Sequence, residues 1–99
     1  MKKDLNKFIE NSNKVAEILK EMSHPVRLRL LCYLFEKEKV SVEDITSFCE
    51  ISQPQVSHFL KRLKDKKIVS FKREKNTYYY TIEDENIKEI IKSLNKIYC

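Results

Sequence analysis

Glycine is absent from the 99 residues of this chain, and several kinds of functional site are excluded with it. A Gly-rich phosphate loop, a GxGxxG dinucleotide-binding turn and a GxSxG nucleophile elbow need backbone conformations that only glycine adopts at low cost. Histidine occurs only twice, and no paired carboxylates mark a catalytic cleft. The sequence therefore predicts a protein that is not an enzyme and needs no cofactor.

Long apolar runs are also lacking. The longest covers only residues 30–35, whereas a helix that crosses a bilayer needs about 20 apolar residues. The polar start of the chain has no apolar segment of the signal-peptide type. We therefore expect a cytoplasmic protein without a membrane partner.

Cysteine is scarce, and its spacing excludes two common uses. The three cysteines are Cys32, Cys49 and Cys99, with no CxxC among them. This pattern argues against a zinc knuckle and against a secreted disulfide scaffold. In a reducing cytosol, a pair of these thiols serves either as small apolar side chains that fill space in the fold or as a reversible redox switch.

The chain does contain enough apolar residues for a folded core, and it carries an excess of positive charge. It is 41% hydrophobic and 35% charged, which with its length predicts one folded domain over residues 1–99. The 20 Lys and Arg outnumber the 15 Asp and Glu, giving a net charge of +5. A basic domain of this kind favours an acidic partner, such as nucleic acid.

Hydrophobic periodicity predicts two helices in the first third of the chain, over residues 4–22 and 25–37. We expect Ser23 to cap the second helix, whose first turn accommodates Pro25. The first helix is long for such a small domain, which is explained if part of its apolar face meets a second subunit. The apolar face of the second helix is predicted to carry Leu28, Leu31, Cys32 and Phe35, widened by Leu30 and Leu34.

Two capping boxes predict the next pair of helices. Ser41 with Asp44 begins a short helix, and Ser52 with Gln55 begins a fourth helix that has Pro54 in its first turn. The core face of the fourth helix is formed by apolar residues at helical spacing, namely Val56, Phe59, Leu60 and Leu63. The pair has the order of a helix-turn-helix.

The period then changes from helix to strand. Residues 68–71 and 77–82 are rich in β-branched and aromatic residues, and residues 72–76 form a polar hairpin tip in which Asn76 is expected to be left-handed. Asp84 is placed to cap a last apolar-striped helix. The predicted fold is mostly α with a β-hairpin wing: a winged helix-turn-helix with additional N- and C-terminal dimerisation helices.

The outer face of the fourth helix is polar, and the following segment is basic. Between residues 53 and 77 there are eight basic and two acidic residues, so the positive excess of the chain lies there. Amide, hydroxyl and imidazole groups read base edges, whereas lysine and arginine neutralise phosphates. The candidate DNA-binding residues are Gln53, Gln55, Ser57, His58, Lys61, Arg62, Lys72, Arg73, Lys75 and Thr77.

Three stretches carry a resemblance to a known family. Residues 19–28, 51–60 and 78–80 are similar to the ArsR/SmtB family of dimeric bacterial repressors, which typically show an S-Q-x-x-V-S-x-H-L run and paired tyrosines. The resemblance implies a homodimer, built from the first and last helices, that binds a palindromic double-stranded DNA operator.

The same resemblance guides the prediction of the sensor. The metal sites usual in the family are missing, because no CxC lies on the third helix and no His follows His58, so no metal is expected. The strings around Cys32 and Cys99 resemble the persulfide- and redox-sensing branch, which is SqrR-, BigR- and HlyU-like. By resemblance, Cys32 and Cys99 form a disulfide or polysulfide bridge in response to reactive sulfur species or oxidant, and Cys49 belongs to the core.

Two alternatives stay open at this point. One keeps DNA binding but assigns a metal or an organic inducer at a non-standard site. The other is a winged-helix module that binds protein, with an incidental basic patch. A DNA affinity that falls steeply with salt argues against the second.

Overall fold

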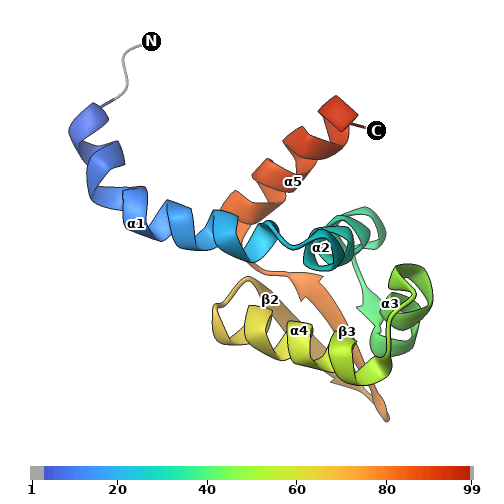
Figure 1. Ribbon diagram of the computed structural model, residues 1–99. Coiled ribbons are helices and arrows are strands. Elements are labelled where there is room, and N and C mark those ends of the chain that lie inside the picture. The colour runs from blue at the N-terminus through green and yellow to red at the C-terminus, as the bar shows by residue number, and fades with distance from the viewer. Residues whose placement is uncertain (1–3, 99) are drawn as a thin grey trace.

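The computed structural model describes residues 4–98, which form five helices and a three-stranded antiparallel sheet (Figure 1). This arrangement is the predicted winged helix-turn-helix with a further helix at each end. In chain order the elements are α1 (Leu5–Met22), α2 (Pro25–Lys37), β1 (Val40–Ser41), α3 (Val42–Cys49), α4 (Gln53–Asp65), β2 (Val69–Glu74), β3 (Thr77–Ile82) and α5 (Glu85–Tyr98).

Side-chain caps explain where three of these helices begin. Ser41 and Asp44 form a capping box at the start of α3, and Ser52 and Gln55 form another at the start of α4. Asp84 accepts the backbone N–H groups of residues 86 and 87 at the start of α5. Each cap satisfies donors that the first helical turn leaves unpaired, so the predicted boundaries are confirmed.

The predicted cap of α2 is wrong, because His24 takes the position assigned to Ser23. The Oγ of Ser23 donates to the carbonyl of Lys20 at 2.8 Å and closes α1, while Nδ1 of His24 accepts the N–H of Val26 at 3.2 Å. The physical reason is Pro25, which disfavours helical geometry in the preceding residue. His24 is therefore extended, as an N-cap must be, whereas Ser23 keeps helical dihedrals.

The wing hairpin is longer and its turn is tighter than predicted. β2 continues through Glu74, which pairs with Thr77, so only Lys75 and Asn76 form the turn rather than the whole of residues 72–76. The left-handed residue is Lys75, with φ of 57°, and not Asn76. Because β2 is an edge strand, its charged side chains reach solvent without interrupting the pairing.

A third strand was not predicted. β1 pairs with β3, with Val40 opposite Tyr80 and Ser41 opposite Tyr79. Two residues are too few to show a strand period, so only the tertiary pairing defines this strand. It attaches the wing to the segment between α2 and α3.

Several turns are made without glycine and therefore at a cost. Among residues 4–98, positive φ angles occur at Glu38, Glu50, Lys67 and Lys75. Left-handed backbone in such residues costs about 1–2 kcal/mol each. Glu50 forms the turn of the helix-turn-helix between α3 and α4, so burial of the core must offset these costs.

The core lies between α2, α3, α4, α5 and the sheet. On α2 the residues that are fully buried are Leu30, Leu31 and Leu34, whereas Leu28, Cys32 and Phe35 are only partly buried. All six predicted residues of α2 thus lie in the core or against it, and the wide buried surface agrees with the widening of the stripe by Leu30 and Leu34. The core positions of α4 are as predicted except that Phe59 is half-buried, and Cys49 is in the core as predicted.

α1 and α5 extend away from the body of the domain (Figure 1), and both carry exposed apolar residues near their free ends. Leu5, Phe8 and Ile9 are exposed on α1, and Ile97 and Tyr98 are exposed on α5. Water contact with so many large apolar side chains is unfavourable, and such surfaces mark interaction sites. No helix in residues 4–98 has the length and apolar character needed to cross a membrane.

Candidate nucleic-acid interface

The second helix of the helix-turn-helix presents a polar outer face. α4 directs Val56, Leu60 and Leu63 into the core, and this fixes the opposite face toward solvent. The predicted base-reading residues Gln53, Gln55, Ser57 and His58 are all exposed in its N-terminal half. The N-terminus of a helix carries partial positive charge, so this half of α4 is suited to an approach to a polyanion.

The wing supplies the basic part of the same surface. Lys72, Arg73 and Lys75 are exposed on β2 and its turn, and Thr77 is half-buried at the start of β3. Nε of Arg73 donates to the carbonyl of Lys75 at 3.0 Å, which orders the tip of the hairpin. α4 contacts β2, so the helix that carries the polar face and the strand that carries the basic wing residues are neighbours in the fold.

An aromatic contact joins α4 to the wing, and the sequence analysis missed it. Nζ of Lys64 lies 5.1 Å from the centre of the Phe71 ring, and Phe71 packs edge-on against Tyr78. The guanidinium of Arg73 lies 5.7 Å from the Tyr78 ring. Alternate residues of a strand share one face, so the spacing of Phe71 and Arg73 could have indicated in the sequence that they lie on the same face of β2. These contacts orient Lys64 and Arg73, and Arg73 is itself one of the candidate DNA-binding residues.

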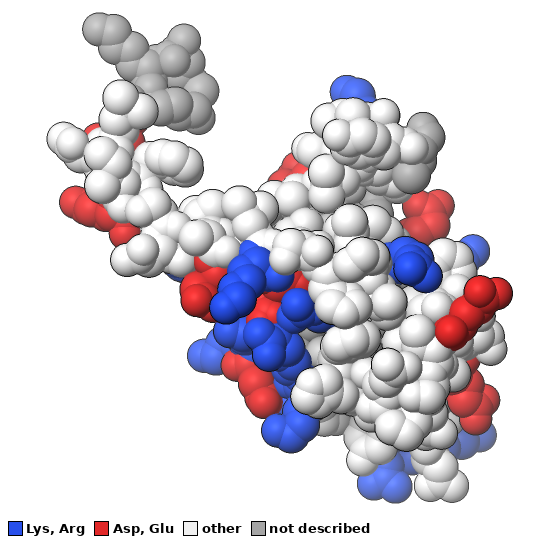
Figure 2. Space-filling model, in the orientation of Figure 1, with Lys and Arg blue, Asp and Glu red and all other residues white. Residues whose placement is uncertain are grey.

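Arg62 differs from the other nine candidates because its side chain is directed at Glu21. Nε of Arg62 donates to the two carboxylate oxygens of Glu21 at 2.7 and 2.8 Å, although the two residues are 41 positions apart. Arg27 donates to the same carboxylate, and Nζ of Lys66 lies 3.7 Å from it. The side chain of Glu21 is only 1% exposed. Figure 2 shows Lys and Arg atoms gathered around acidic atoms below the C-terminal half of α1.

The pKa of Glu21 reflects this environment. Burial raises the pKa, but the hydrogen bond from Arg62 and the charges of Arg27, Arg62 and Lys66 outweigh it and hold the pKa below its ordinary value. Glu21 is therefore ionised at neutral pH. A buried carboxylate of this kind is tolerated because it is paired with cations.

We expect Glu21→Gln to destabilise the protein by about 3 kcal/mol at pH 7, because it breaks a buried ion-pair network, and part of this loss depends on pH. The folded pKa is depressed, so as the pH falls the unfolded state takes up the proton first. The contribution is therefore present above the unfolded pKa and is lost as the pH falls through the folded pKa. Urea unfolding of both proteins between pH 3 and 7 measures this difference. A difference that stays constant or grows in acid contradicts the expectation.

The cysteines occupy different environments. Cys49 is buried, and burial raises the pKa of its thiol, which makes it a poor nucleophile. Cys32 is half-buried on α2. Cys99, the other residue of the predicted sensing pair, lies outside the described residues. Near the end of α5, Nδ2 of Asn95 donates to Glu36 of α2 at 3.5 Å.

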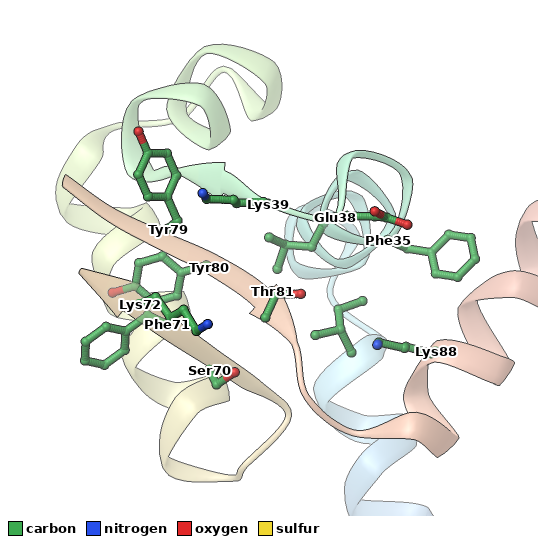
Figure 3. A pocket seen from close by; sticks show the side chains of 12 residues that line it. Phe35, Glu38, Lys39, Ser70, Phe71, Lys72, Tyr79, Tyr80, Thr81 and Lys88 are labelled. Carbon is green, nitrogen blue, oxygen red and sulfur yellow. The ribbon is translucent and has the colours of Figure 1, made fainter. Parts of the chain in front are cut away.

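A groove of about 570 Å³ lies between the wing, the end of α2 and the start of α5. Figure 3 shows the side chains of Lys72 and Lys88 pointing into it from opposite sides, with Thr81 between them in the view. Phe35 and Tyr80 add aromatic surface. In residues 4–98, no group of three or more His, Cys, Asp or Glu side chains is placed to hold a metal ion.

Comparison with known proteins gives consistent matches over nearly the whole chain. A family model described as TFIIE alpha subunit matches residues 11–97. The transcriptional activator HlyU of Vibrio cholerae is 33% identical over 96 residues, which cover 97% of this chain and 88% of HlyU. The biofilm growth-associated repressor of Xylella fastidiosa is 34% identical over 90 residues, covering 91% of this chain and 78% of the repressor.

Solved structures match equally well. The structure of the transcriptional repressor BigR from Xylella fastidiosa has a TM-score of 0.89 and 31% identity, and covers 98% of both chains. That of reduced HlyU from Vibrio cholerae has a TM-score of 0.87 and 32% identity, and covers 94% of this chain and 97% of the HlyU chain. The names of these matches are those of regulators: HlyU is named as a transcriptional activator, and the two Xylella proteins are named as repressors.

Proposed function

Because this chain belongs to the ArsR/SmtB family of winged-helix transcriptional regulators, and also to the sequence family of the TFIIE alpha model, we propose that it is a dimeric repressor that binds a palindromic operator. It is a DNA-binding regulator of transcription and not an enzyme. The observation that carries the proposal is the exposed polar half of α4, a helix that contacts the strand carrying the exposed basic residues of the wing.

The proposed binding mode follows from the dimensions of α4. A helix of 13 residues is about 20 Å long and fits the major groove, which is about 12 Å wide. Gln53, Ser57 and His58 then face base edges, while Lys61 and the wing residues Lys72, Arg73, Lys75 and Thr77 contact the backbone. Gln55 contributes through the N-terminal turn that its capping box holds in place.

We propose that the apolar ends of α1 and α5 meet those of a second copy. A palindrome presents two half-sites about one helical turn of DNA apart, so two recognition helices must be held at that spacing. The exposed side chains on α1 and α5 provide the surface for this contact. Both termini leave the domain away from α4, so such a dimer keeps both recognition helices accessible (Figure 1).

The proposed switch is a bridge between Cys32 and Cys99. Bridging removes two electrons and two protons from the thiols, and an oxidant or a sulfane sulfur donor accepts them. The Asn95 to Glu36 contact supports the pairing, because it brings the last turns of α5, which precede Cys99 in the sequence, against α2, which carries Cys32. A bridge between α2 and α5 changes the angle of a dimer helix and moves the two recognition helices off their spacing.

The groove of Figure 3 favours a second candidate for the inducer. Its lysine and aromatic lining suits an organic anion with an apolar body. An organic acid that releases operator DNA from a protein with both Cys32 and Cys99 changed to Ser supports this candidate. Release that requires both thiols supports the bridge.

Base-reading and phosphate-binding residues are expected to differ in what they affect. Ser57→Ala and His58→Ala lower operator affinity by about 1–3 kcal/mol each and leave binding to random duplex nearly unchanged. Lys72→Gln lowers affinity for both duplexes similarly and reduces the slope of log affinity against log salt by about one. Fluorescence anisotropy on an operator selected from a random pool measures both effects. Equal losses on both duplexes for all three variants contradict this division of roles.

A further inference from the structure

Two acidic residues of α1 hold two basic residues at the end of α4. Glu17 and Glu21 lie one turn apart on α1, and Arg62 and Lys66 lie one turn apart at the C-terminal end of the recognition helix. Arg62 binds Glu21, and Nζ of Lys66 lies 3.4 Å from Glu17. Figure 2 shows basic and acidic atoms gathered below α1. A direct electrostatic link thus connects the helix that leaves the domain with the helix that faces DNA.

The burial of Glu21 gives this link its strength. Charged residues are generally exposed or half-buried in this domain, and among those in residues 4–98 Glu21 alone is fully buried. The side chain of Glu21 is 1% exposed whereas that of Arg62 is 43% exposed, so the pair is partly screened on the side of the guanidinium. Separating it still leaves a buried carboxylate with one partner fewer. Exposed pairs such as that of Lys61 with Asp65 lack this property. Arg62 is therefore oriented by its two hydrogen bonds to Glu21, while part of its side chain still reaches solvent.

We propose that Glu21 is a positioning residue that sets the orientation of α4 relative to α1 and withholds Arg62 from the DNA phosphates. This inference rests on the proposed function and assigns Arg62 a role different from the phosphate contact predicted from the sequence. With Arg62 held, the end of α4 adds rigidity rather than sequence-independent charge. Discrimination between operator and random DNA then depends on Glu21, which does not touch DNA.

The test compares Glu21→Gln with Glu10→Gln in the full chain. Glu10 lies on the same helix, is exposed, and takes part in none of the ion pairs among residues 4–98, so both variants change the net charge equally. Affinities for a selected operator and for random duplex are measured across a salt series. A loss of folding alone lowers both affinities by the same factor and leaves their ratio unchanged, so the ratio reports positioning.

For Glu21→Gln we expect the operator-to-random ratio to fall about fivefold or more, with random binding strengthened and a steeper salt slope. Glu10→Gln keeps the wild-type ratio. In an Arg62→Gln background, Glu21→Gln produces no further gain in random binding, because no guanidinium is released. Equal ratios for Glu21→Gln and Glu10→Gln overturn the inference.

A separate outcome covers a folding defect. If circular dichroism shows that Glu21→Gln is unfolded, the Arg62→Gln variant alone tests the inference. We expect Arg62→Gln to lower the operator-to-random affinity ratio without strengthening binding to random duplex. A wild-type ratio for Arg62→Gln overturns the inference. If the wild-type protein itself does not prefer any duplex over another, the proposed function fails. That result is distinct from an intact wild-type preference that Glu21 does not affect.

Discussion

Phe8→Glu is expected to convert the protein from dimer to monomer and to lower operator affinity by a factor of about 100 or more. Phe8 is 60% exposed, and Leu5 and Ile9 beside it are also exposed on α1. A carboxylate buried in an apolar interface without a cation is strongly unfavourable. A monomer engages one half-site, and linked binding to two half-sites typically adds a factor of 10² to 10⁴.

Light scattering after gel filtration and anisotropy titration of the operator measure the two effects of Phe8→Glu. The matched control is Lys14→Gln, which changes the net charge by the same amount at an exposed, polar position of the same helix. The control is expected to remain dimeric and to bind the operator. A Phe8→Glu protein that is still dimeric, or a monomer with unchanged operator affinity, would show that this face is not the dimer interface.

Cys32→Ser is expected to abolish the response to a sulfane sulfur donor. The wild-type protein should lose operator affinity by about 5- to 150-fold on treatment, the range of typical coupling between two sites. The variant should keep the affinity of the reduced protein, because serine cannot form the bridge to Cys99. Cys49→Ala serves as the control, since Cys49 is in the core and its burial raises the pKa of the thiol.

Mass spectrometry of the same samples shows how the response arises. Treated wild-type protein should contain a peptide pair joined through Cys32 and Cys99, with a mass that gives the number of bridging sulfur atoms. A response that persists in Cys32→Ser, or a joined pair with unchanged operator affinity, would separate the thiols from the switch. The inducer would then have to be sought elsewhere, beginning with the groove beside Lys72 and Lys88.

The features that the sequence predicted well are local. The capping boxes of Ser41 and Ser52 involve residues three positions apart, and each is present in the structure. The helical stripe of α4 also follows from a single periodicity, so its polar outer face could be assigned to one side. Local rules of this kind need no knowledge of the rest of the fold.

The features that were missed depend on contacts between distant residues. The pairing of Val40 with Tyr80 defines strand β1, which is too short for its own sequence pattern to indicate a strand. The degree of burial of each apolar residue on α2 also depends on its neighbours, which is why Leu30 and Leu34 are more buried than Leu28 and Phe35. The ion pair of Glu21 and Arg62 joins α1 to α4 across the chain. In contrast, the His24 cap could have been predicted, because Pro25 restricts the residue before it.

The most direct measurement of the central claim is a salt series of operator binding by the reduced protein, with the stoichiometry determined in the same titration. We predict two protomers per duplex and a log affinity that falls linearly with log salt, with a slope that reflects several phosphate contacts from each protomer. An affinity that does not depend on salt, or saturation at one protomer per duplex, would contradict a symmetric pair of basic wings and recognition helices on DNA.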